Sequence, residues 1–243
     1  MQAIFVSVRT ASSRLPNKCI LNLCGQPSIK YIIDSMKKSK YADQIVLCTT
    51  TKQEDTMLCH IADGCGIKYF RGSSDDKLSR WLGACNKFNV DFFVNVDGDD
   101  LFFDYELADH ILLQNKNNPI DFIDGQGYLY NDAYGISYTG LKKVCKIKTT
   151  TDTEYIKPYF TKAKLNTEPV KNYDDKWKKR KIRMTLDYPE DFTFFKTVIS
   201  AIKPKEISFN NVLDYLSKNP DVVNINYAQE LKWSQNQKRQ FQL

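Results

Sequence analysis

The sequence predicts an α/β fold built on a mostly parallel sheet that is flanked by helices. Short apolar runs alternate with segments whose apolar residues recur at the i, i+3, i+4, i+7 spacing of an amphipathic helix. This alternation continues through residues 3–96, and such an order is typical of parallel strands joined by right-handed crossovers. With 42% hydrophobic residues among 243, the chain also has enough apolar material for a substantial core.

Strands and helices are expected in strict alternation in the first part of the chain. The strands lie at residues 3–8, 44–48, 67–70 and 92–96. The helices carry their apolar stripes on Ile29, Ile32, Ile33 and Met36, on Leu58, Ile61, Ala62 and Cys65, and on Leu78, Trp81, Leu82 and Cys85.

The rest of the chain is less regular. Leu107, Ile111 and Leu112 indicate a helix, and Pro189 opens another at a favoured first-turn position. Further elements are expected as strands at 121–123, 135–138 and 182–186 and as helices at 154–160 and 209–216. A polar tail begins near Lys232 and is expected to fray.

Charge and cysteine usage narrow the class of protein. The formal net charge of +6 allows an anionic substrate but does not require nucleic acid. Seven cysteines without a CxxC pair suit buried thiols in a reducing cytosol, and His60 and His110 match no metal-binding spacing. No apolar run reaches the length of about 18 residues that a membrane helix needs, and no signal peptide is recognisable. We therefore expect a cytoplasmic protein that binds neither membrane nor nucleic acid.

Polar side chains gather where the predicted parallel strands end. The segments at those ends are 9–18, 49–51, 71–76 and 97–100, and they carry cations, hydroxyls and carboxylates. Ligands of open parallel sheets bind at this carboxyl edge. The mixture of groups predicts a site for a phosphorylated ligand and a divalent metal.

The first of these segments reads RTASSRLPNK. Arg9, Arg14 and Lys18 can bind phosphate oxygens, and the hydroxyls of Ser12 and Ser13 can add neutral donors. The segment is not a Walker A loop, and a solvated basic loop is the alternative. Its position after the first strand favours phosphate binding.

Two acidic segments are candidates for the metal. Asp97, Asp99 and Asp100 follow the strand at 92–96, where clustered carboxylates need a neutralising cation, although Asp and Gly also favour a tight turn. Asp187, in RMTLDYPEDF, either reaches the same metal or caps the helix that Pro189 opens. The basic run KWKKRKIR at 176–183 reads as a solvated face more readily than as a nucleic-acid site.

The order of these motifs resembles a known family. R-x-x-S-x-R-L-P-x-K at 9–18 is followed by GQPSI at 25–29, VLCTTTKQED at 46–55, FRGSSDDKLSRW at 70–81, TEYIKPYF at 153–160 and RMTLDYPEDF at 183–192. Together they resemble the CTP-dependent cytidylyltransferases, which include CMP-Kdo and CMP-sialic acid synthetases, and most of all the SpsF branch of spore-coat polysaccharide biosynthesis.

The resemblance implies a Rossmann-like sheet of the nucleotidyltransferase type and assigns roles to individual residues. Arg9, Lys18 and Asp99 would act in catalysis, and Mg²⁺ would bind Asp99 and Asp187. The nucleotide would contact Arg9, Ser12, Ser13, Arg14, Lys18, Thr49, Arg71, Ser73 and Asp97. Relatives usually have glycine where Ala11 and Asn17 stand, so the backbone of this loop is expected to be less free.

The resemblance also implies an organisation and a reaction. Residues 1–243 would form one nucleotidyltransferase domain, with a nucleotide-binding half at 1–103, an acceptor-binding half at 104–232 and a tail at 233–243. CMP would pass from CTP to a small-molecule acceptor with release of pyrophosphate. The acceptor would be a sugar acid, which analogy favours, or a phosphorylated or phosphonylated compound. Family analogy also allows a homodimer, with contacts from the second half.

Two other functions stay open at this point. Asp97-Gly98-Asp99 is a D-x-D pattern of the kind that metal-dependent glycosyltransferases use to bind nucleotide sugars. A non-enzymatic module that binds anionic polymers would show salt-sensitive binding without a preference for CTP.

Overall fold

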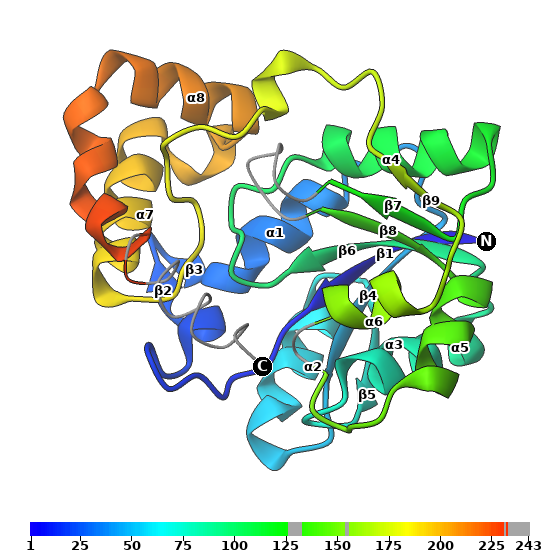
Figure 1. Ribbon diagram of the computed structural model, residues 1–243. Helices are drawn as coiled ribbons and strands as arrows, with labels where there is room; N and C mark the ends of the chain where they lie inside the picture. Colours follow the sequence, from blue (N-terminus) through cyan, green and yellow to red (C-terminus); the bar gives the residue numbers. More distant parts are fainter. Residues whose placement is uncertain (126–132, 154–155, 231, 233–243) are drawn as a thin grey trace.

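A seven-stranded sheet lies at the centre of the computed structural model, which describes residues 1–125, 133–153, 156–230 and 232 (Figure 1). Its strands run in the order β5-β4-β1-β6-β8-β7-β9, and β8 alone runs against the others among the described residues. The strands are β1 (Gln2–Ser7), β4 (Gln44–Thr50), β5 (Lys68–Gly72), β6 (Phe92–Asp97), β7 (Phe122–Asp124), β8 (Tyr134–Ser137) and β9 (Thr167–Pro169). A separate hairpin pairs β2 (Asn22–Leu23) with β3 (Gln26–Pro27). This confirms the predicted mostly parallel sheet.

Helices cover both faces of the sheet (Figure 1). They are α1 (Ser28–Met36), α2 (Thr56–Gly64), α3 (Lys77–Phe88), α4 (Tyr105–Asn117), α5 (Tyr138–Ile147), α6 (Lys157–Lys162), α7 (Pro189–Ile202) and α8 (Phe209–Lys218). No helix in the described part of the chain is both long enough and apolar enough to cross a membrane.

Alternate residues of the central strands supply two separate cores. Ile4 and Val6 of β1 face the layer that contains α1, α2, α4, α7 and α8, whereas Ala3 and Phe5 face α3, α5 and α6. Phe5 stacks on Phe93 of β6, with ring centroids 4.2 Å apart. Burial on both faces explains why these strands appear in the sequence as continuous apolar runs.

The first part of the chain matches its predicted elements closely. Each predicted strand up to residue 96 lies within two residues of β1, β4, β5 or β6. Each predicted apolar stripe in this region falls on α1, α2 or α3, except that Cys65 follows the last residue of α2. The later helices led by Leu107, Pro189 and Phe209 are also present, as α4, α7 and α8.

Several elements in the second part of the chain differ from those predicted. The strand expected at 182–186 is absent, because this segment makes one backbone bond, Leu186 N to Asp99 O at 2.9 Å, rather than a ladder. The strand expected at 135–138 ends at Ser137, whose side chain accepts a bond from Gly140 N and caps the unpredicted helix α5. Strand β9 was also unpredicted. The helix expected at 154–160 is found at 157–162, and residues 154 and 155 lie outside the described residues, as does the tail at 233–243.

The loop at 9–18 keeps the left-handed turn that a glycine would favour. Asn17 has φ 56° and ψ 24°, in the left-handed region, where asparagine is among the few tolerated residues besides glycine. Ala11 is not among the residues with positive φ. The two substitutions noted in the sequence therefore differ: position 17 needs the unusual conformation and position 11 does not.

Candidate active site

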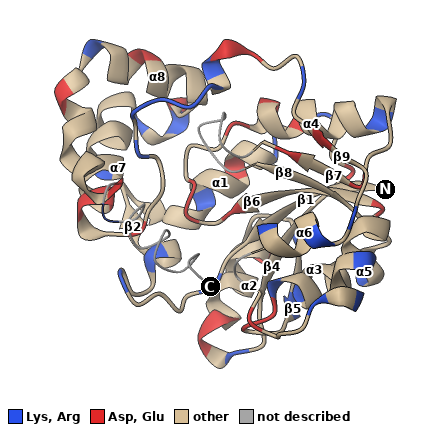
Figure 2. Ribbon diagram, viewed as in Figure 1, with Lys and Arg blue, Asp and Glu red and all other residues tan. Residues whose placement is uncertain are grey.

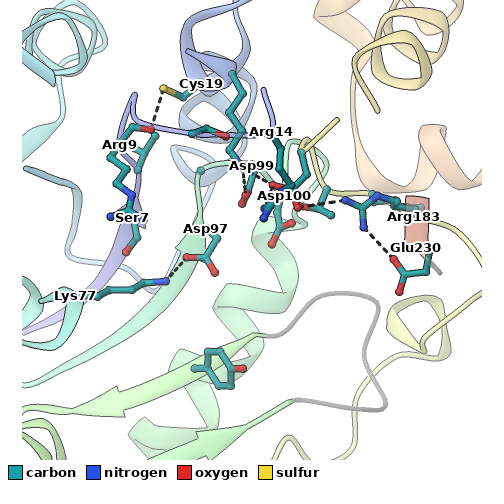
Figure 3. Close-up of a pocket in the computed structure, with 18 of the residues that line it drawn as sticks. Ser7, Arg9, Arg14, Cys19, Lys77, Asp97, Asp99, Asp100, Arg183 and Glu230 are labelled. Carbon is teal, nitrogen blue, oxygen red and sulfur yellow. Dashed lines mark hydrogen bonds and ion pairs between the residues drawn. The ribbon is translucent and has the colours of Figure 1, made fainter. Parts of the chain in front are cut away.

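A cleft of about 1140 Å³ opens at the carboxyl ends of β1 and β6 (Figure 3). Its walls come from the loop at 9–18, the first turns of α3 and α6, the loop at 97–100 and the segment at 179–187. It thus lies at the predicted edge of the sheet and draws on both halves of the chain.

The sheet register brings the two key loops together. Ser7 of β1 pairs with Asp97 of β6, and Gly98 N donates to Ser7 O at 2.8 Å. A Cβ at position 98 would lie 2.7 Å from Cβ of Val8 and 3.1 Å from Ser7 O, so a side chain has no room here. Glycine at this position lets the two loops approach closely and sets Asp99 beside the loop at 9–18.

Lys18 lies between two carboxylates that are far apart in the sequence. Its Nζ is 2.5 Å from Oδ2 of Asp99 and 2.7 Å from Oδ1 of Asp187. Burial lowers the pKa of Lys18, but the two carboxylates more than offset this and hold it above its ordinary value. Arg14 also reaches Oδ1 of Asp187, at 2.7 Å. Burial raises the pKa of Asp187, yet Lys18 and Arg14 outweigh it and bring that pKa to about 2.

Asp187 is directed into the site by its neighbours. Helix α7 begins after Tyr188, and Asp191 accepts bonds from the backbone N–H groups of Asp187 and Tyr188, both at 2.9 Å. Capping is therefore done by Asp191, and the alternative role of Asp187 as helix cap is wrong. The carboxylate of Asp187 therefore does not cap the helix and pairs with Arg14 and Lys18 instead.

Arg183 lies behind Asp187 and is almost fully buried. Its guanidinium contacts Asp191 at 2.9 Å, Glu230 at 3.1 Å and Asp187 at 3.3 Å (Figure 3). A buried arginine that satisfies three carboxylates is a fixed scaffold rather than a mobile ligand group. It ties the segment at 183–191 to the C-terminal part of the described chain.

Asp97 belongs to a different network from Asp99. Its Oδ1 accepts bonds from Lys77 Nζ at 2.7 Å and Asn95 Nδ2 at 3.1 Å. Burial raises the pKa of Asp97, but Lys77 outweighs this effect and keeps the pKa below its ordinary value. The Oδ1 of Asn95 accepts in turn from Ser7 Oγ at 2.6 Å, and Ser7 Oγ accepts from the indole of Trp81 at 2.8 Å. This buried chain of hydrogen bonds fixes the orientation of Asp97.

Most of the predicted site residues meet in this cleft. Those that line it are Arg9, Ser12, Ser13, Arg14, Lys18, Asp97, Asp99, Asp100 and Asp187. Thr49, Arg71 and Ser73 are not among the lining residues. Thr49 is fully buried, and Arg71 lies on strand β5 and donates to the carbonyl oxygens of Thr50 and Lys52. The side-chain Oγ of Ser73 accepts a hydrogen bond from Asp76 N just before α3.

Several lining residues were not predicted. They include Lys77, Arg80, Tyr134, Lys157, Lys179, Lys181 and Glu230. The basic run at 176–183 was visible in the sequence, but its composition alone favours a solvated surface. Its position over the cleft depends on tertiary contacts that no local pattern reveals.

The carboxylates fit a divalent cation. Asp99 and Asp187 both contact one ammonium group, so their oxygens converge on a point that a cation can occupy. No group of three His, Cys, Asp or Glu side chains suited to a metal occurs in the described ranges. Two carboxylates completed by phosphate oxygens and water are the usual set for Mg²⁺ bound with a nucleotide.

Comparisons with known proteins agree with this geometry. A family model described as cytidylyltransferase matches residues 3–204. The spore coat polysaccharide biosynthesis protein SpsF of Bacillus subtilis is 23% identical over 234 residues, which cover 89% of this chain and 94% of that protein. A cytidylyltransferase from Leptospira borgpetersenii has a similar structure, with a TM-score of 0.82, 25% identity and coverage of 91% of this chain and 96% of that chain. A CMP:2-keto-3-deoxy-manno-octonic acid synthetase complexed with CTP shares the fold, with a TM-score of 0.66, 12% identity and coverage of 83% and 99%.

Proposed function

The chain belongs to the cytidylyltransferase family, and we propose that it transfers CMP from CTP to an anionic small-molecule acceptor with release of pyrophosphate. As a family member it is a nucleotidyltransferase. The acceptor is a sugar acid or a phosphorylated or phosphonylated compound. One solved relative is a synthetase for a keto-deoxy sugar acid, and SpsF is named for polysaccharide biosynthesis.

The observation that carries the proposal is the meeting of Lys18 with Asp99 and Asp187. Three side chains from residues 18, 99 and 187 converge on one point of the cleft at 2.5 and 2.7 Å. A carboxylate pair for a metal beside three cations, Arg9, Arg14 and Lys18, provides what a triphosphate and its metal require.

In this reaction the protein mainly positions the reactants and neutralises the developing negative charge. An acceptor oxygen attacks the α-phosphorus of CTP, a P–O bond forms, and the bond to the leaving pyrophosphate breaks. Arg9, Arg14 and Lys18 bind the triphosphate oxygens and stabilise the charge that develops on pyrophosphate. Lys18 can take this role only by exchanging its carboxylate partners for phosphate oxygens.

Asp99 and Asp187 would hold Mg²⁺ in this proposal. The metal, when bound, supplies positive charge to the α-phosphate and helps to orient it. Lys18 would then give up both carboxylates and turn its ammonium group to the phosphate oxygens.

The glycosyltransferase alternative receives less support from the geometry. A D-x-D motif uses both of its carboxylates around one metal-bound nucleotide sugar, whereas Asp97 here is held by Lys77 and Asn95 and does not contact Lys18 as Asp99 does. The family match covers most of the chain and names a different reaction.

A pyrophosphate-release screen tests the proposal. The full chain is incubated with Mg²⁺, each of the four nucleoside triphosphates, and a panel of sugar acids, sugar phosphates and phosphonates. We expect pyrophosphate with CTP and an anionic acceptor, and loss of it when Mg²⁺ is chelated. Equal release with all four triphosphates, or release of a nucleoside diphosphate from a nucleotide sugar instead, would contradict the proposal.

A further inference from the structure

The basic run at 176–183 is held over the cleft by contacts of several of its own residues. Lys176 lies 3.2 Å from Asp104, and the indole of Trp177 donates to the same carboxylate at 2.7 Å. Lys178 pairs with Asp175 at 2.7 Å. Because Asp104 caps α4, these contacts attach the segment to the body of the protein. The segment is the blue stretch that leads toward α7 in Figure 2.

The arginines of this run are also occupied. Arg180 donates to the backbone carbonyl oxygens of Asp175, Lys176 and Lys178, and Arg183 is buried among carboxylates. Planar guanidinium forks bind carboxylate or phosphate oxygens with two parallel hydrogen bonds. In this segment they serve the fold rather than a ligand.

Lys179 and Lys181 differ from every other cation of the run. Both are exposed and both line the cleft. Neither makes a hydrogen bond or an ion pair with another described residue. Lys157, at the start of α6, also lines the cleft, but it pairs with Asp124 at 3.6 Å.

The charge of the cleft leaves room for an anion besides the nucleotide. Among the described residues, ten Lys or Arg side chains line it but only five Asp or Glu. Magnesium-bound CTP neutralises part of this excess through the loop at 9–18. Lys77 and Arg80 of α3 already have partners in Asp97 and Ser73 O, whereas Lys179 and Lys181 lie after residue 104, in the half from which the acceptor is expected to bind.

We infer that Lys179 and Lys181 bind a phosphoryl or phosphonyl group of the acceptor. The inference rests on the proposed function and decides between its two acceptor classes. Lysine binds phosphate as a mobile point charge, and the two positive charges of Lys179 and Lys181 match a dianion better than they match the single negative charge of a carboxylate. The acceptor is accordingly a phosphorylated or phosphonylated compound rather than a simple sugar acid.

The test uses small dianions as probes of this subsite. The full chain is saturated with Mg²⁺ and α,β-methylene-CTP, and methyl phosphate, methylphosphonate and acetate are titrated separately, with ligand NMR as the readout. We expect either dianion to bind at least roughly tenfold more tightly than acetate, on the scale of one lost charged hydrogen bond. Comparison of the two dianions tells whether the natural group is phosphoryl or phosphonyl.

Two double variants with the same charge change identify the subsite. Lys179→Gln/Lys181→Gln should weaken the binding of either dianion at least roughly tenfold and leave the binding of acetate unchanged. Lys162→Gln/Lys205→Gln is the control, because both of these lysines are exposed and neither lines the cleft. Circular dichroism of each variant verifies that the fold is unchanged.

Different failures have different meanings. If the CTP analogue binds but neither dianion does, or if both double variants behave alike, this inference is wrong and the proposed function stands. If acetate binds as tightly as the dianions, the acceptor class is a sugar acid. If the CTP analogue does not bind, the proposed function is wrong and this inference falls with it.

Discussion

Two cationic segments of the cleft differ in how their charges are balanced. In the loop at 9–18, Arg14 and Lys18 are paired with Asp99 and Asp187. In the segment at 176–183, Lys179 and Lys181 have no described partner. Paired cations indicate a place where one positive charge can replace another, as a metal would. Unpaired cations indicate that the missing negative charge arrives with a ligand.

Among the changes that test this contrast between the two segments, removal of Asp99 should have the largest effect, a loss of turnover. Asp99→Ala leaves Lys18 with Asp187 alone and removes half of the carboxylate pair proposed for Mg²⁺. We expect turnover to fall roughly a hundredfold to a thousandfold, the scale for loss of one group that stabilises a transition state. Pyrophosphate release under saturating CTP measures it.

The control for Asp99 is an acid outside the cleft. Asp63→Ala on α2 is exposed and should leave turnover unchanged. Thermal melting should be nearly the same for both variants, because the Asp99 side chain is not in the core. Wild-type turnover in Asp99→Ala would remove this residue from the mechanism.

Arg14→Ala should show the next largest effect, on CTP binding rather than on the fold. Loss of a charged hydrogen bond to the triphosphate is expected to cost about 1.5–3 kcal/mol, or roughly tenfold to more than a hundredfold in Kd. Calorimetric titration with CTP measures this, and Lys52→Ala, exposed and outside the cleft, is the control. An unaltered Kd for CTP would exclude Arg14 from the triphosphate site and break the proposed contrast between the two segments.

The two segments also differ in how well the sequence predicts them. Loop 9–18 follows β1, which is buried on both faces. The apolar run of that strand and the apolar stripe of the next helix are local signals, so the sequence alone predicts where this loop lies. The segment at 182–186 has the alternating pattern of a strand but no neighbouring strand to pair with, so it remains extended with one backbone bond. Arg183 looks solvated in a basic run, and its burial depends on Asp191 and Glu230, which no local pattern connects to it.

Acid should weaken the paired region selectively. The folded-state pKa of Asp187 is about 2, below the ordinary 3.8, so its ionised form stabilises the fold above about pH 4. That contribution, of about 2 kcal/mol, is lost as the pH falls from 3.8 toward 2. Urea unfolding at pH 7 and at pH 3 measures the change in free energy of unfolding.

Asp187→Asn identifies the group responsible. This variant cannot ionise, so its stability should fall less between pH 7 and pH 3 than that of the wild type. Asp221→Asn, at an exposed position outside the cleft, should lose as much stability as the wild type does. Equal acid sensitivity in all three proteins would show that the Lys18–Asp187 pairing does not stabilise the fold.

The smallest expected effect concerns the backbone that presents the paired cations. Because Asn17 is left-handed, Asn17→Gly removes a steric penalty and should keep or raise stability, by at most about 1 kcal/mol. Ala11→Gly is the matched control: its φ is not positive, so glycine only adds freedom to the unfolded chain and should cost about 0.4–1 kcal/mol. Urea unfolding of both variants measures the difference, with the Kd for CTP as a second readout. If the two glycines destabilised equally, the left-handed turn at residue 17 would not be what shapes this loop, and Arg14 and Lys18 would owe their positions to Asp99 and Asp187.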